Sequence, residues 1–189
     1  LQKFNYGQDM MAMRSVQSVI MAGGTGTRLW PVSTSSLPKQ FIKLFDGKSL
    51  LQITLERNKE FSIPAIMVRH EHRIIAQKQI EEVGIEADII VEPSEKSTAP
   101  CAIIASLYAQ KKQADTVLLL PVDHFIQGES KYIESIKRAA SISDDKNIVT
   151  FGIKPTRAHS GYGYMEIGLE ISKKLYAIKK FVEKPDTAT

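Results

Sequence analysis

A glycine-rich turn near the start of the chain has the residue types of an anion-binding site. The turn reads Gly23-Gly24-Thr25-Gly26-Thr27-Arg28 and directly follows an apolar stretch at residues 16–22. Glycines let the backbone turn its N–H groups toward one point, and such a group of donors binds phosphate. Arg28 adds a planar fork of donors, and Lys39 adds a compact positive charge. The sequence therefore predicts a site that holds the polyphosphate of a nucleotide.

The spacing of this turn excludes two better-known phosphate loops. A Walker loop needs Gly-Lys-Ser/Thr after its four-residue gap, whereas here Gly26 is followed by Thr27 and Arg28. A dinucleotide-binding fingerprint needs a third glycine three residues after the second, where this chain has Leu29. A tight turn without a ligand is the alternative, and the spacing does not by itself select a substrate.

Apolar stretches that alternate with helical patterns predict an α/β fold. The expected strands are residues 16–22, 65–69, 87–91, 116–121 and 148–153, and the expected helices are 50–61, 72–83, 99–112 and 131–141. This order predicts a mostly parallel sheet with helices on both faces. Beyond it, residues 162–167 and 175–182 are expected to form two strands with a turn around Gly168.

Three polar residues follow the expected strands at their carboxyl ends. Arg28 follows the first strand, Glu92 the third and Asp123 the fourth. Sheets of parallel strands bind their ligands at this edge. We therefore expect these side chains to lie near the glycine turn.

Composition and charge exclude several classes of protein. The chain has 189 residues, 43% of them hydrophobic, and a net charge of +4, which suits a small anionic substrate. No basic run has interleaved aromatic residues, and no apolar stretch approaches about 18 residues, so we expect neither nucleic-acid nor membrane binding. The one cysteine, Cys101, cannot form an internal disulfide and is expected in the core. A cytoplasmic location is expected.

Five blocks of residues, in a fixed order, carry a family resemblance. The first is the glycine turn with Pro38-Lys39-Gln40-Phe41, and the last is Phe181-Val182-Glu183-Lys184-Pro185. Between them lie Glu92-Pro93 with Thr98-Ala99-Pro100, then Pro121-Val122-Asp123-His124, then Gly152-Ile153-Lys154-Pro155-Thr156 with Gly161-Tyr162-Gly163-Tyr164. Over residues 16–186 the chain resembles the sugar-nucleotide pyrophosphorylases, and its Pro-Lys-Gln-Phe form is similar to their guanylyltransferase branch.

The resemblance implies a Rossmann-like nucleotidyltransferase fold and the transfer of GMP from GTP to mannose-1-phosphate, giving GDP-mannose and pyrophosphate. The attacking sugar phosphate is already largely an anion at pH 7, since its second pKa is near ~6. Catalysis then needs positioning and charge neutralisation rather than a strong general base. Two alternatives stay open: another hexose-1-phosphate nucleotidyltransferase, or a non-catalytic nucleotide-binding homologue.

The expected catalytic residues are Arg28 and Lys39, which would bind phosphate oxygens. Asp123 is the expected ligand of Mg²⁺, which prefers oxygen donors. Each of these two residues has an alternative interpretation. Lys39 could be a solvated lysine, and Asp123 could cap the turn after Pro121. The residues expected to bind the nucleotide are Ala22, Gly23, Gly24, Thr25, Gly26, Thr27 and Glu92.

The sugar-phosphate site is implied by the resemblance alone. Glu183 would accept hydrogen bonds from sugar hydroxyls, Lys184 would pair with the sugar phosphate, and Gly163 would let the backbone approach the sugar. The alternative is a charged pair at the end of a strand.

The expected organisation is an N-terminal extension at residues 1–15 and a nucleotidyltransferase domain at 16–189, truncated at its C-terminal end. The family continues to a second metal-binding aspartate, so we expect weak or no activity from this portion alone. One departure from the family pattern is Lys96-Ser97, where Arg-Asn is usual. A homo-oligomer is left open.

Overall fold

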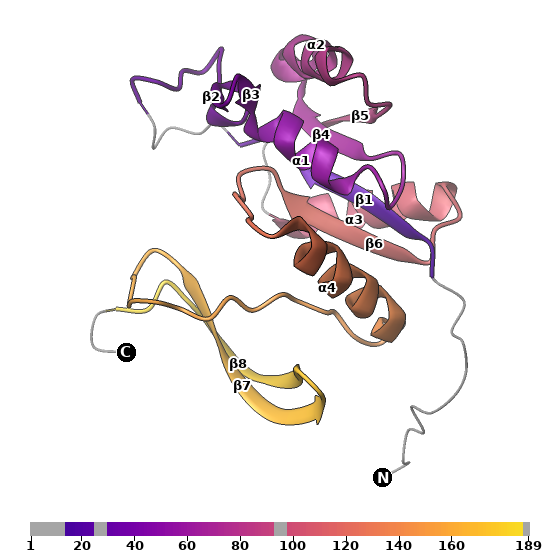
Figure 1. The fold of residues 1–189 in the computed structure, drawn as a ribbon, viewed down its shortest axis with the longest axis vertical. Coiled ribbons are helices and arrows are strands. Elements are labelled where there is room, and N and C mark those ends of the chain that lie inside the picture. The colour runs from indigo at the N-terminus through magenta and orange to yellow at the C-terminus, as the bar shows by residue number, and fades with distance from the viewer. Residues whose placement is uncertain (1–13, 25–29, 93–97, 187–189) are drawn as a thin grey trace. The chain divides into compact units, whose positions relative to one another are not determined.

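The computed structural model describes residues 14–24, 30–92 and 98–186 of the chain (Figure 1). It divides into two compact units, Leu1–Asp145 and Lys146–Thr189, called unit 1 and unit 2 below.

Unit 1 contains a four-stranded parallel sheet in the order β5-β4-β1-β6. Its strands are β1 (Val16–Met21), β4 (Ala65–Arg69), β5 (Asp88–Glu92) and β6 (Thr116–Pro121). The two central strands, β1 and β4, are almost entirely buried, as expected for strands covered on both faces. The predicted parallel sheet is confirmed.

Helices cover both faces of this sheet. Side chains alternate along β1, so that Ile20 packs with Leu55 of α1 (Leu50–Asn58) while Val19 packs with Ala105 of α3 (Thr98–Lys111) on the other face. Helix α2 (Arg73–Val83) joins the cluster of α1, and α4 (Glu129–Ile142) packs on β1 and β6. Figure 1 shows α1 and α4 in front of the sheet and α3 behind it. Cys101, a residue of α3, lies in the core, as predicted.

Local signals set the ends of two of these helices. Ser49 and Gln52 form a reciprocal capping box at the start of α1, which satisfies two otherwise unpaired backbone N–H groups. Gly84, with φ of 63°, ends α2 in the left-handed conformation that glycine adopts at no steric cost. The remaining short elements of unit 1 are η2 (Lys39–Phe41), β2 (Lys43–Phe45), β3 (Lys48–Ser49) and η3 (His70–His72).

Unit 2 contains an antiparallel hairpin of β7 (Gly163–Ser172) and β8 (Leu175–Glu183). The prediction of a turn around Gly168 is wrong. The chain turns instead between the strands, where Lys174 has φ of 58°. Gly168 lies within β7, where the strand register shifts, and glycine inside a strand commonly marks such an irregularity.

The prediction of a strand at residues 148–153 is also wrong. This segment has no regular structure, and Ile148 and Ile153 are 91% and 87% exposed. A strand needs a neighbour to pair its backbone groups, and the described residues offer none to this segment.

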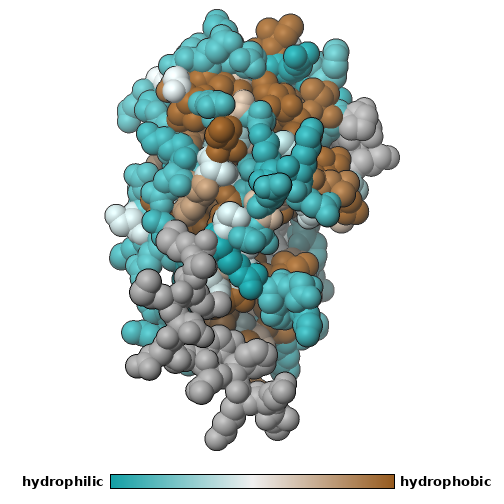
Figure 2. All heavy atoms as spheres, turned by 90° about the vertical axis from the view of Figure 1, so that its right-hand side faces the viewer, coloured by the Kyte–Doolittle hydropathy of each residue, from teal (hydrophilic) through white to brown (hydrophobic). Residues whose placement is uncertain are grey.

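Some hydrophobic side chains stay exposed on the described surface. On α3, Ile103 and Leu107 are each 62% exposed, and Figure 2 shows hydrophobic residues in brown between hydrophilic ones. Within the described residues, every helix is too short or too polar to cross a bilayer.

Candidate active site

The carboxyl edge of the sheet brings together Lys39 and Asp123, which are 84 positions apart in the sequence. Lys39 Nζ lies 2.5 Å from Asp123 Oδ2. Lys39 is carried by η2, and Asp123 comes two residues after β6. Two predicted site residues from different motifs therefore form one ion pair.

Helix α1 holds the segment that carries Asp123. Thr54 Oγ1 donates to the Val122 carbonyl (3.2 Å), and Arg57 Nη2 donates to the His124 carbonyl (3.1 Å). Arg57 is buried and lies over the ring of Tyr132. These contacts fix the backbone on both sides of Asp123.

The Asp123 carboxyl stays ionised at neutral pH. Its partial burial raises its pKa, but the hydrogen bond and charge of Lys39 outweigh that effect, so the net pKa lies below the ordinary value. The pair is only partly shielded, since about a third of the Asp123 side chain is exposed. A charged ligand can therefore reach both groups.

The start of the glycine turn is tied to the sheet and to Gln40. Ala22 N donates to the Met67 carbonyl (2.8 Å), which continues the β1–β4 ladder. Gln40 Nε2 donates to the carbonyls of Ala22 and Gly24, at 2.7 Å each. The predicted site residues Thr25, Gly26, Thr27 and Arg28 lie outside the described residues.

Glu92 ends β5 directly beside the turn. Its buried carboxylate accepts a hydrogen bond from Cys101 Sγ (2.9 Å). A Cβ atom at Gly23 would lie 2.3 Å from Glu92 Oε2, and Gly23 is not in the left-handed region. Gly23 is therefore needed for space rather than for an unusual φ. Burial and the bond to Glu92 raise the pKa of Cys101 to about 11, so this thiol stays protonated.

Asp123 could serve as a single protein ligand of a divalent cation. Among the described residues, no three His, Cys, Asp or Glu side chains come together as an all-protein metal site. A single ionised, partly exposed carboxylate suits Mg²⁺, which usually takes its other ligands from phosphate and water.

The predicted sugar-phosphate residues lie together in unit 2. Gly163 pairs with Glu183 across the hairpin, and Lys184 Nζ lies 3.5 Å from Glu183 Oε1. A Cβ atom at Gly163 would lie 2.6 Å from the Phe181 ring and 2.8 Å from Glu183 Oε2. A side chain at this position would therefore displace the ends of the exposed Phe181 and Glu183 side chains. Lys184 has φ of 46°, and its N–H donates to the Tyr162 carbonyl.

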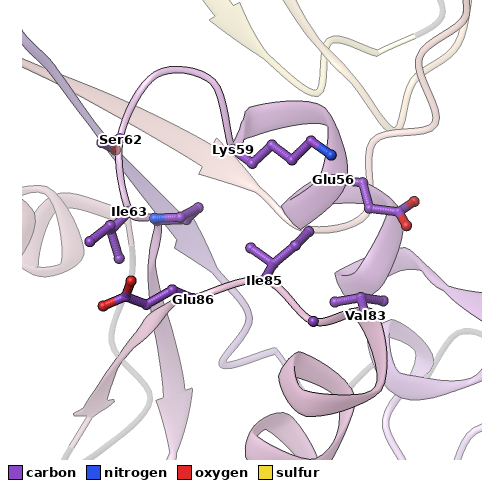
Figure 3. Close-up of a pocket in the computed structure, with 9 residues that line it drawn as sticks. Glu56, Lys59, Ser62, Ile63, Val83, Ile85 and Glu86 are labelled. Atoms are coloured by element: carbon purple, nitrogen blue, oxygen red, sulfur yellow. The ribbon is translucent and has the colours of Figure 1, made fainter.

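A cavity of about 360 Å³ lies at the opposite, amino end of the sheet (Figure 3). It is lined by α1, by the segment before β4 and by the turn between α2 and β5. Lys59, Ile63 and Ile85 are among its residues. No predicted site residue lines it.

Sequence reasoning missed Gln40 and Arg57 as site residues. Arg57 could have been found from its spacing on the helix. It lies three positions after Thr54, on a helix whose Leu51 and Leu55 face the core, so a charged side chain there is placed toward the sheet. Gln40 was visible only as a member of the Pro-Lys-Gln-Phe block. Its contacts could not be predicted, because its two acceptors are backbone carbonyls 18 and 16 residues away.

Residues 17–189 match the nucleotidyl transferase family. The chain is 40% identical over 181 residues to the xanthan biosynthesis protein XanB of Xanthomonas campestris pv. campestris. It is 41% identical over 193 residues to mannose-1-phosphate guanylyltransferase 2 of Escherichia coli O157:H7. These alignments cover 94% and 95% of this chain but 38% and 40% of the relatives, so the chain spans about two fifths of their length.

The fold is similar to a crystal structure of mannose-1-phosphate geranyltransferase from Thermus thermophilus. The TM-score is 0.84 at 32% identity, over 92% of this chain and 51% of that chain. Because the family match spans nearly the whole chain and the fold agrees with it, this chain belongs to the nucleotidyl transferase family.

Proposed function

We propose that this chain is part of an enzyme that transfers GMP from GTP to mannose-1-phosphate, releasing pyrophosphate. The observation that carries the proposal is the Lys39–Asp123 pair at the carboxyl edge of the sheet, beside the start of the glycine turn. The relatives at about 40% identity that are named mannose-1-phosphate guanylyltransferases support the choice of substrates.

In the proposed reaction, an oxygen of the mannose-1-phosphate attacks the α-phosphorus of GTP. A new P–O bond forms, the bond to the bridging oxygen of the β-phosphate breaks, and pyrophosphate leaves with that electron pair. Two anions must meet, so the protein has to neutralise charge and align the reactants.

Each residue has a proposed part in this alignment. Lys39 and Arg28 bind the triphosphate and stabilise charge on the leaving pyrophosphate. The turn residues Ala22, Gly23, Gly24, Thr25, Gly26 and Thr27 donate backbone or hydroxyl groups to the nucleotide. Glu92 binds the nucleotide together with the turn, and its carboxylate lies where a Cβ atom at Gly23 would reach it.

Asp123 would hold Mg²⁺, which supplies charge neutralisation at the phosphates when bound. GTP would then give Lys39 and Asp123 new partners, a phosphate for the lysine and a cation for the carboxylate. In unit 2, Glu183 binds sugar hydroxyls and Lys184 the sugar phosphate, with Gly163 beside them.

The test is turnover with Mg²⁺, mannose-1-phosphate and GTP, UTP, dTTP or CTP in turn, followed by pyrophosphate release and chromatography of the sugar nucleotide. We expect GTP to bind and to be the preferred nucleotide. If another nucleotide were preferred, the proposed activity would change from guanylyl transfer to transfer of that other nucleotide. Binding of GTP without pyrophosphate release, also in the longer polypeptides typical of the relatives, would favour a non-catalytic role. Absence of GTP binding would overturn the proposal.

A further inference from the structure

We propose that Gln40 is a positioning residue that holds the start of the glycine turn, Ala22–Gly24, in the orientation that binds phosphate. This inference rests on the proposed function, because it assigns Gln40 a part in binding GTP. Gln40 comes directly after Lys39 in η2 and is 1% exposed.

The contacts of the Gln40 amide define its orientation. Its Nε2 donates to the carbonyls of Ala22 and Gly24, both at 2.7 Å. The reversed amide would place Oε1 against two carbonyl oxygens, neither of which can donate. Oε1 itself has no hydrogen-bond partner among the described residues. The two hydrogen bonds therefore fix the orientation of the Gln40 amide and, equally, the orientation of the Ala22 and Gly24 carbonyls.

The bond to the Ala22 carbonyl determines where the start of the turn presents its first N–H donor. Within a planar trans peptide, the N–H points away from the carbonyl. Holding the Ala22 carbonyl toward Gln40 therefore directs the Gly23 N–H to the opposite side. Without Gln40, the glycines would allow the carbonyls to rotate, and an outward carbonyl would repel phosphate.

The same short segment also places Lys39. Helix η2 is itself anchored by Gln79 Nε2, which donates to the Phe41 carbonyl (2.7 Å). Lys39 reaches Asp123 from this segment while Gln40 reaches the turn. Gln40 thus links the position of the lysine to the shape of the turn.

The test compares Gln40→Met with Gln17→Met. Gln17 is a matched control because it is also buried and its Nε2 donates to two backbone carbonyls, of Ser18 and Ile63, but near the other end of β1. Both variants keep the side-chain size. Gln40→Met loses two hydrogen bonds, and Gln17→Met loses its two bonds to carbonyls and a longer one to Ser62 Oγ (3.4 Å). The probes are GTP with Mg²⁺ and pyrophosphate alone, measured by titration calorimetry, together with hydrogen exchange of the Gly23 amide.

We expect both variants to lose similar stability against denaturant. Only Gln40→Met should weaken GTP and pyrophosphate binding, by about tenfold or more, and speed exchange at Gly23. As a second variant, Gln40→Glu can donate only when its carboxyl is protonated, so its GTP affinity relative to wild type should rise as the pH falls.

Two results would overturn this role with the proposed function intact. One is a Gln40→Met variant that binds GTP within twofold of wild type. The other is a Gln17→Met variant that loses as much affinity as Gln40→Met. If Gln40→Met does not fold, a Gln40→Glu affinity that follows wild type across pH would overturn it too. A wild-type chain that binds neither GTP nor pyrophosphate would instead overturn the proposed function, and this role with it.

Discussion

Unit 1 and unit 2 differ sharply in how they bury their side chains. In unit 1 the sheet and its helices enclose residues such as Val19, Leu55 and Ile66, which are fully buried. In unit 2, by contrast, no residue in the described range 146–186 is buried. A two-stranded hairpin is at best marginally stable in water by itself. The stability of the chain is therefore expected to reside in unit 1.

The two units also differ in charge. Unit 1 has seventeen basic and seventeen acidic residues, whereas unit 2 has eight and four, so unit 2 carries the whole net charge of +4. A net positive unit favours an anionic ligand. Under the proposed function, unit 1 would bind the nucleotide and unit 2 would supply positive charge for the sugar phosphate.

The largest expected effect comes from the core of unit 1. Leu55→Ala should lower the free energy of unfolding by roughly 2–5 kcal/mol, because it removes apolar contacts and leaves a cavity. Ile167→Ala in the hairpin should cost less than about 1 kcal/mol, since Ile167 is 62% exposed. Denaturant unfolding followed by circular dichroism measures both. Equal losses would break the proposed contrast between the units.

Lys39→Met should weaken GTP binding by roughly 100-fold, because it removes a charged phosphate donor. It should leave mannose-1-phosphate binding nearly unchanged if the sugar site belongs to unit 2. Titration calorimetry with each ligand measures the effect. Lys48→Met is the matched control, since Lys48 pairs with Glu56 away from the turn. Equal losses of GTP affinity in the two variants would remove Lys39 from the site.

Lys184→Met should raise the Kd for mannose-1-phosphate by about tenfold, through loss of one charge-assisted hydrogen bond. GTP affinity should stay within about twofold. Lys173→Met, near the other end of the hairpin, removes the same charge and controls for a general electrostatic effect. If both variants lose affinity alike, the net charge of unit 2 matters rather than the particular lysine.

The smallest expected effect concerns the pH dependence of the Lys39–Asp123 pair. The folded pKa of Asp123 lies below its ordinary value of 3.8, so the unfolded chain takes up a proton first as the pH falls. The stabilisation from the pair is therefore complete only above about pH 5, begins to fall near the unfolded pKa and is lost as the pH drops through the folded pKa. Because the pair is partly exposed, it should be worth under about 1 kcal/mol.

Lys39→Met should also raise the Asp123 pKa, since burial would then act on the carboxylate without an opposing charge. A carboxyl NMR titration of both proteins would measure this shift. Lys43→Met, which removes the partner of Glu82 instead, should leave Asp123 unchanged. An unaltered Asp123 pKa in Lys39→Met would contradict the pairing.

The sequence alone was sufficient to predict the parallel sheet and the edge of that sheet at which Asp123 lies. Runs such as Val16–Met21 and Thr116–Pro121 carry apolar residues on both faces and are short and bounded by turns, a pattern typical of a covered strand. Residues that follow such strands must gather at one edge, which is why Asp123 was predicted near the glycine turn.

Only the tertiary structure decided which side chains meet. Two sets of hydrogen bonds join segments that are far apart in the chain. Lys39 bonds to Asp123, and Gln40 bonds to the carbonyls of Ala22 and Gly24. Their distances depend on how the helices pack, which periodicity does not encode. The wrong prediction of a strand at 148–153 has the same cause. The segment does contain the apolar residues typical of a strand, but a strand also requires a neighbouring strand to pair with its backbone groups.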